Sequence, residues 1–466
     1  MAPKSVFNRL DAFLPGTDNA RQAISFLQEC IRIDTTNPPG NEIALAEVLK
    51  EKFDALACPF LSTTIIETGP SRGNLIVIVH GSGLGSNKNW GFASHLDVVP
   101  ADGEWQHPPF SGDLVKAEHG EFVWGRGALD MKIAGTSYAV ALFALISEGF
   151  QPKGDIKIIY ESDEETGGHH GMEVLVNDHW DDVKVDALVT EGGGFKFPLG
   201  HDVVIQCGEK GKCQMRIRAT GKAGHGSMPD HYERFALYKL VQVLDRIRTV
   251  KRPVEVGEEY RATINAFSLP RNVKFLLKRK RLLGGLVSLA GKAMHQPELG
   301  RAFIPLVTDT IAPTMLRAGV KENVISPEAE VVLDIRTLPH HDRGVIYALI
   351  ERIVGHNLFS ELVLEPVDEM EATTSPPGTP EYHHIWDVMR EMYPQVNLVP
   401  MLSAGSTDMR YYRMKGVPCY GFVPILKDPD LTYGDMISMP HAPDERVSVD
   451  NLMLATEFAY RLMRTV

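Results

Sequence analysis

The first two hundred residues alternate short apolar runs with longer stretches of helical character. Runs such as NLIVIVHG, WGFASHLDVV and DIKIIYES are separated by segments such as RQAISFLQECIRI and KIAGTSYAVALFALISEG. This alternation is typical of α/β domains, in which helices connect neighbouring parallel strands. We therefore predict an α/β fold with a mainly parallel sheet from about residue 20 to about residue 205.

The pattern changes from residue 211 to residue 373. Alternating strands such as KCQMRIRATGK and AEVVLDIRTL here flank the helix-like stretches YERFALYKLVQVLDRIRTV and GVIYALIERIVGH, which indicates an inserted α+β domain. The turn-rich TTSPPGTPEY then leads back to a helix and a strand of the first kind. The predicted organisation is a discontinuous catalytic domain, residues 1–210 and 374–466, interrupted by a second domain at 211–373.

Composition and charge exclude several classes of protein. A chain of 466 residues with 44% hydrophobic composition can bury two cores. A formal charge of -12 would repel a phosphate backbone, so no nucleic-acid partner is expected. We find no apolar stretch long enough for a membrane span and no N-terminal targeting signal. The five cysteines form no C-x-x-C pair, which favours a reducing, cytoplasmic setting.

One segment, residues 273–294, is both basic and apolar. Such a pattern indicates an amphipathic helix that either packs within the second domain or lies on a membrane surface. We favour packing within the domain.

Polar side chains follow the apolar runs at the points where strands are expected to end. His95 and Asp97 are two positions apart and share one face of a strand, so Asp97 could fix the tautomer of a metal-binding imidazole. An ordinary hydrogen bond at a strand end is the alternative. Asp130 lies in GRGALDMK, just before a long apolar helix, where it is either a helix cap or a ligand.

Three adjacent carboxylates, Asp163, Glu164 and Glu165, directly follow the strand DIKIIYES. Buried together they would repel one another unless cations were present, whereas an exposed acidic turn would need none. Adjacent glutamates also suit a division of labour, in which one binds metal and its neighbour serves as general base. Glu191 after the next strand and His441 in SMPHAPDE are further candidates, with a strand-end cap and a loop histidine as alternatives.

Together these positions provide two imidazoles and three carboxylates for a pair of metal ions. Each ion would take one histidine and one terminal carboxylate, and a third carboxylate would bridge. Three carboxylates and a hydroxide balance two divalent cations, so the buried charge would be close to neutral. The five candidate ligands are His95, Asp130, Glu165, Glu191 and His441.

The ordered motifs H-x-D, G-x-G-x-x-D-x-K, D-E-E-T-G-G, T-E-G-G-G and a late P-H resemble those of a family of zinc metallohydrolases. This family includes aminoacylase, glutamate carboxypeptidase, succinyl-diaminopimelate desuccinylase and carnosinase, and the likeness spans nearly the whole chain. The resemblance implies a binuclear zinc hydrolase domain with an inserted lid and dimerisation domain. It also implies that His95 and Glu191 hold one zinc ion, that Glu165 and His441 hold the other, and that Asp130 bridges them.

The same resemblance assigns roles to further residues. Asp97 is expected to orient His95, Glu164 to be the general base, and the peptide bond from Asp130 to Met131 to be cis. His225, in TGKAGHGSMP, is expected to polarise the scissile carbonyl. The residues expected to bind substrate are Asn323, Arg336, Ser406, Thr407 and Arg410, the last three in the loop GSTDMRYY. Without the resemblance, a turn histidine and a lid salt bridge would be the simpler interpretations of His225 and Arg336.

The predicted reaction is hydrolysis of the amide bond of a dipeptide or an N-acyl amino acid with a free carboxylate. Two divalent ions are expected, zinc first, with cobalt or manganese as alternatives. An aminopeptidase and a catalytically silent metal-binding or interaction protein remain rival hypotheses. The extra segment at about 270–312 resembles the carboxypeptidase S branch, and the resemblance further implies a homodimer formed through the lid, with His225 acting on the other subunit.

Overall fold

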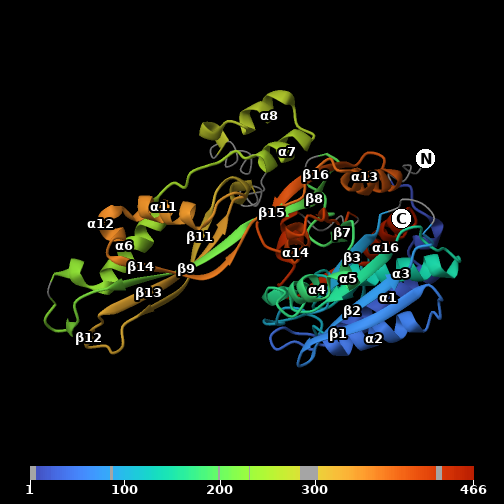
Figure 1. Ribbon diagram of the computed structural model, residues 1–466, viewed down its shortest axis with the longest axis horizontal. Helices are drawn as coiled ribbons and strands as arrows, with labels where there is room; N and C mark the ends of the chain where they lie inside the picture. The colour runs from blue at the N-terminus through green and yellow to red at the C-terminus, as the bar shows by residue number, and fades with distance from the viewer. Residues whose placement is uncertain (1–6, 84–87, 198–199, 230, 284–302, 427–432) are drawn as a thin grey trace.

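The alternating runs of the sequence form a nine-stranded sheet, on which the larger of two bodies is built (Figure 1). The computed structural model describes residues 7–83, 88–197, 200–229, 231–283, 303–426 and 433–466. The strands run in the order β1-β2-β6-β3-β7-β17-β8-β15, and β16 also pairs with β8. Their bounds are β1 Leu61–Gly69, β2 Arg72–Val79, β3 Trp90–His95, β6 Ile156–Glu161, β7 Ala187–Thr190, β8 Asp202–Glu209, β15 Thr373–Thr374, β16 Asn397–Ser403 and β17 Cys419–Gly421.

The four central strands, β6, β3, β7 and β17, are parallel to one another, while antiparallel pairs flank them on both sides. The predicted α/β class with a mainly parallel sheet is therefore confirmed. Helices cover both faces, and successive residues of one strand enter different cores: Ile158 belongs to one cluster and Ile159 to the other. Contributing helices are α1 (Asp18–Arg32), α2 (Glu42–Asp54), α3 (Lys132–Ser147), α13 (Pro380–Met392) and α16 (Val449–Met463) on the first face, with α4 (Met172–Asp178) and α14 (Met409–Met414) on the second.

A four-stranded antiparallel sheet forms the second body, which projects away from the first (Figure 1). We refer to this body as the lid. Its order is β11-β13-β9-β14, and helices α6 and α11 pack on it around a separate core. All its strands come from residues 211–370, within the range predicted for the inserted domain. The bounds are β9 Gly211–Thr220, β11 Thr310–Ala318, β13 Glu328–Thr337, β14 Leu362–Met370, α6 Ala236–Thr249 and α11 Arg343–Val354.

Helix α7 (Glu258–Ala266) packs on the large sheet and not on the lid sheet. Its side chains Tyr260 and Ile264 share a core with Val204 of β8 and Val399 of β16. Sequence position places α7 inside the predicted second domain, but its apolar face is buried against the catalytic body.

The basic and apolar segment predicted at 273–294 is described only up to residue 283. Helix α8 (Arg271–Leu277) places Leu277 against the core around α7, whereas Phe275 is exposed. The remainder of the segment lies outside the described residues. No helix in the part of the chain that the structure describes is both long enough and apolar enough to cross a membrane.

Candidate active site

The candidate metal ligands meet where parallel strands of the large sheet end. His95 is the last residue of β3 and pairs with Glu161, the last residue of β6. Glu164 and Glu165 lie in the short turn after β6, and Glu191 directly follows β7. Because the carboxyl ends of neighbouring parallel strands lie at one edge of the sheet, residues nearly a hundred positions apart come together there.

Asp130 lies between the two candidate histidines. Its Oδ1 is 3.2 Å from Nε2 of His95, and its Oδ2 is 3.1 Å from Nε2 of His441. Glu191 Oε2 lies 3.8 Å from Nε2 of His95, and Glu165 Oε2 lies 3.2 Å from Nε2 of His441. Two ligands bound to one zinc ion at about 2.0–2.1 Å with tetrahedral angles are separated by about 3.3 Å. The structure thus brings all five predicted ligands together, in the pairing that the resemblance implied.

The charges in this cluster fit a pair of cations. Burial raises the pKa of Glu164 well above its ordinary value, and burial together with Asp130 raises the pKa of Glu191 to about 7. Hydrogen bonds to Asp130 and Glu165 raise the pKa of His441 to about 10. The carboxylates therefore compete for positive charge, which two divalent ions would supply.

An unpaired oxygen supports the same interpretation. Glu165 Oε1 is buried and has no hydrogen-bond partner among the described residues. Such an atom is costly to bury unless a cation or donor meets it. Imidazole and carboxylate ligands together suit zinc, and they also suit cobalt or manganese.

Asp97 contacts His95 differently from the expectation. The Nδ1–H of His95 donates to the backbone carbonyl of Asp97 at 2.9 Å, whereas the nearer carboxylate oxygen is 3.6 Å away. The Asp97 carboxylate instead accepts the backbone N–H groups of Glu164 and Glu165, each at 3.1 Å. Asp97 therefore fixes the imidazole through its carbonyl and holds the two glutamates through its side chain. The peptide bond after Asp130 is cis, as predicted.

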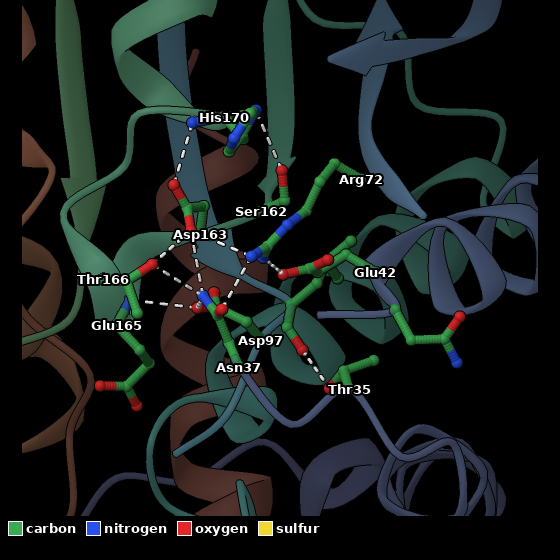
Figure 2. Close-up of polar contacts among 12 residues, drawn as sticks. Thr35, Asn37, Glu42, Arg72, Asp97, Ser162, Asp163, Glu165, Thr166 and His170 are labelled. Atoms are coloured by element: carbon green, nitrogen blue, oxygen red, sulfur yellow. Dashed lines mark hydrogen bonds and ion pairs between the residues drawn. The ribbon is translucent and has the colours of Figure 1, made fainter. Parts of the chain in front are cut away.

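Sequence reasoning missed Asn37, which lies behind this turn (Figure 2). Its side-chain amide donates to Asp97 Oδ2 at 2.8 Å and to Asp163 Oδ1 at 3.1 Å. Arg72 donates to the Asn37 carbonyl oxygen at 2.8 Å and also pairs with Glu42. This buried network spans four segments of the chain and fixes the acidic turn from behind.

Sequence reasoning also missed Glu445, four residues after His441. The fully buried Glu445 carboxylate accepts the backbone N–H groups of Leu129 at 2.8 Å and Asp130 at 2.9 Å. It also pairs at 2.7 Å with Arg126, whose guanidinium donates to the carbonyl of His441 at 3.2 Å. One ion pair thus joins the loops that carry Asp130 and His441. The acidic residue in PHAPDE was the only signal, and it gave no indication of a partner.

A cleft of about 780 Å³ opens over the cluster and reaches the lid. Lid residue Arg336 lines it, and its guanidinium is held by Asp334 at 2.8 Å and by Ser406 Oγ at 3.2 Å. Two of the predicted substrate-binding residues therefore face each other across the junction of the two bodies, next to the candidate metal ligands.

Thr407 and Arg410 have partners within the protein. The Thr407 hydroxyl donates to Glu209 at 3.1 Å, and Thr407 does not line the cleft. Arg410 lines the cleft, but its guanidinium donates to the carbonyl of Gly167 at 2.7 Å. The first contact ties the loop after β16 to the end of β8, and the second ties α14 to the acidic turn.

His225 and Asn323 lie together at the end of the lid that is remote from the large sheet (Figure 1). His225 belongs to the two-stranded antiparallel sheet of β10 (Gly224–His225) and β12 (Val324–Ile325), and Asn323 directly precedes β12; the N–H of Gly226 donates to the carbonyl of Asn323 at 2.9 Å. Both side chains are exposed, and neither lines the cleft. Within one chain, the structure does not bring them to the metal-ligand cluster.

Comparison with known proteins decides the family. Residues 91–465 match Peptidase family M20/M25/M40. The chain belongs to this family. The predicted resemblance is thereby confirmed, as is the prediction of a hydrolase.

Individual relatives cover most of the chain. The N-fatty-acyl-amino acid synthase/hydrolase PM20D1 of Mus musculus is 27% identical over 99% of this chain and 92% of its own length. Aminoacylase-1 of Sus scrofa is 26% identical over 90% of both chains. The solved structure of an M20 family metallo-carboxypeptidase, Sso-CP2 from Sulfolobus solfataricus, superposes with a TM-score of 0.70 at 17% identity, covering 95% of this chain and 99% of its own. The structural likeness extends to the whole two-body fold.

Proposed function

We propose that this protein hydrolyses the amide bond of an N-acyl amino acid or a dipeptide that carries a free carboxylate. The observation behind the proposal is the placement of Arg336 in the same cleft as four of the five candidate metal ligands, Asp130, Glu165, Glu191 and His441. An arginine fork recognises a carboxylate with paired hydrogen bonds, and here Asp334 and Ser406 hold it in place. The names of the relatives, an aminoacylase and a hydrolase of acyl amino acids, support this substrate class.

In this proposal, His95 and Glu191 hold one ion, Glu165 and His441 hold the other, and Asp130 bridges. The bound ions, which we propose to be zinc, would polarise the scissile carbonyl and lower the pKa of a water molecule. Glu164 is the general base: it accepts the proton from the attacking water and then donates it to the leaving amine. Its backbone N–H is fixed by Asp97, and a ligand atom from each of His95, Glu164 and Glu191 lies within 4.8 Å of the others.

We propose further that a second copy of the chain completes the site with His225 and Asn323. The outer strand of the lid sheet, β11, leaves Met315 and Leu316 exposed, and α6 leaves Leu237 and Val241 exposed. An open strand edge and an apolar helix face suit pairing across a two-fold axis. Such pairing would let the two-stranded sheet of β10 and β12 in each lid reach the cleft of the other chain.

The acidic lining of the cleft favours a second candidate function. Glu173, Asp368, Glu369 and Glu371 all line it, and an aminopeptidase needs acidic groups for a free amine. Most of these residues have partners in the protein: Lys212 pairs with Asp368, Arg343 with Glu369, and His169 with Glu173. The acyl amino acid hypothesis therefore remains the leading one.

The test is a hydrolysis screen of metal-free protein reloaded with zinc, cobalt or manganese. Substrates are matched pairs: an N-acyl amino acid and its C-terminal amide, and a dipeptide and its N-acetylated form. We expect the free acids to be cleaved and their amides to be poor substrates. Preference for a free amine regardless of the carboxylate would instead identify an aminopeptidase, and no cleavage with any metal would reject both hypotheses.

A further inference from the structure

A smaller hollow of about 140 Å³ adjoins the metal-ligand cluster. It shares Asp130 and Glu191 with the large cleft, and its remaining lining is apolar or glycine. The larger apolar side chains on which the argument rests are Leu129, Ile133, Phe195, Val423, Ile425 and Pro440, all of which line the hollow. The hollow therefore begins at the atoms where the reaction would occur.

The fold makes this hollow rigid. Strands β7 and β17 are parallel neighbours, so the chain leaves both at the same edge of the sheet. The two exiting segments remain paired: the N–H of Ile425 donates to the carbonyl of Gly194 at 2.8 Å, and Phe195 forms a parallel bridge with Ile425. A Cβ on Gly194 would meet the carbonyl oxygen of Val423 at 1.9 Å, so only glycine permits this close pairing. The backbone thus presents Phe195 and Ile425 in fixed positions.

The polarity of the hollow contrasts with its surroundings. Leu129, Phe195 and Ile425 remain partly exposed although they lie next to a cluster of carboxylates. Partly exposed apolar walls bind water weakly and favour an apolar ligand group. The large cleft, on the other hand, holds the guanidinium of Arg336. A ligand that spans both spaces has an anionic end, an amide at the metal-ligand cluster and an apolar end.

We propose that this hollow is the binding site for the acyl chain and that it selects linear aliphatic acyl groups up to about hexanoyl. The proposal rests on the proposed function and names the acyl class of its substrate. A volume of 140 Å³ is close to that of an apolar cavity of about 150 Å³ that holds one benzene molecule, which has six carbon atoms. Carbons beyond that number extend outside the apolar walls and add no further affinity.

The first experiment is a chain-length series. Values of kcat/KM are measured for acetyl, butyryl, hexanoyl, octanoyl and lauroyl derivatives of one amino acid. We expect a rise of about fourfold per methylene, corresponding to ~0.8 kcal/mol of burial, up to about hexanoyl and a plateau thereafter. A flat profile from acetyl to hexanoyl, or a rise that continues to lauroyl, would contradict the proposal.

Variants test whether the dependence of kcat/KM on acyl chain length arises in the hollow. Ile425→Trp narrows the hollow and should lower the hexanoyl-to-acetyl ratio of kcat/KM at least tenfold, whereas Phe195→Ala should move the plateau to longer chains. Ile304→Trp makes the same change at an exposed isoleucine that does not line the hollow, and the ratio should stay at the wild-type value. An unchanged ratio in Ile425→Trp, or equal losses on acetyl and hexanoyl substrates, would overturn the assignment.

A binding measurement separates this inference from the proposed function. Calorimetric affinities of N-acetyl and N-hexanoyl amino acids are compared in Glu164→Gln protein, with and without Ile425→Trp. A hexanoyl preference that Ile425→Trp removes supports the hollow, even if wild-type protein cleaves neither compound and the proposed reaction is wrong. Equal affinities for the two compounds would show that the hollow does not bind the acyl chain. Hydrolysis by wild-type protein would in that case still support the proposed reaction.

Discussion

Two adjacent glutamates differ in what their side chains contact. Glu165 Oε2 lies 3.2 Å from His441, and its other oxygen is buried without a partner among the described residues. Glu164 is proposed as the base. Glu164→Gln should therefore retain both metal ions and lose turnover by about 10²–10⁴-fold, whereas Glu165→Gln should lose one ion. Metal content by mass spectrometry and kcat on both variants check this, and a metal-depleted Glu164→Gln protein would show that the two roles are reversed.

Arg336 should matter only for substrates that carry a carboxylate. Its guanidinium is partly exposed in the cleft and oriented by Asp334 and Ser406. Loss of a charge-assisted hydrogen bond of ~1.5–3 kcal/mol predicts that Arg336→Ala lowers kcat/KM for the free acid by about 10–100-fold. The C-terminal amide should change little, and Arg352→Ala, which removes an exposed arginine of the lid helix α11, should change neither. Equal losses on acid and amide would remove Arg336 from substrate binding.

At the scale of loops and strands, the buried Arg126–Glu445 pair holds two ligand-bearing loops together. Glu445→Gln keeps the size of the side chain but leaves Arg126 without its counter-charge. Breaking a buried pair on one side costs ~3–5 kcal/mol, so we expect a clear fall in unfolding free energy together with weaker metal binding. Asp444→Asn, in the same loop, changes a surface contact with Gln106 and serves as the control, with an effect within about 0.5 kcal/mol. Denaturant unfolding measures the unfolding free energy of each variant, and metal titration measures its metal affinity. Wild-type metal affinity in Glu445→Gln would show that the ion pair does not position the ligands.

The parts of this site that were predictable are those encoded locally. Apolar strands that end in His95, in the acidic turn and at Glu191 give a strong pattern, because strand ends and carboxylates are adjacent in sequence. Asn37 could not be found in this way, since its partners Asp97 and Asp163 lie 60 and 126 residues away. The packing of α7 on the large sheet could likewise not be predicted from the sequence, because the pattern of an amphipathic helix does not specify which core the helix covers.

At the scale of the whole molecule, the separation of His225 from the cleft is the reason for proposing a second chain. If two lids pair across a two-fold axis, His225 of each chain serves the site of the other. Glu164→Ala and His225→Ala homodimers should each be nearly inactive, and a mixture that exchanges subunits should regain activity. Each mixed dimer has one site with both residues intact and one with neither. Since random exchange makes about half of the dimers mixed, about a quarter of wild-type activity should return.

The complementation experiment needs proof that subunits have exchanged. It also needs proof that the exposed face of β11 forms the dimer interface. Differently tagged subunits pulled down together show exchange, and Leu316→Lys, which charges the exposed face of β11, should yield monomers and abolish the recovery. Leu114→Lys offers a matched control, because Leu114 is exposed but lies on the catalytic body and does not line the cleft. It should leave the mass in solution at that of a dimer. Sustained inactivity of a verified mixed dimer would mean that His225 does not act across the interface, while the metal chemistry at Asp130 would remain as proposed.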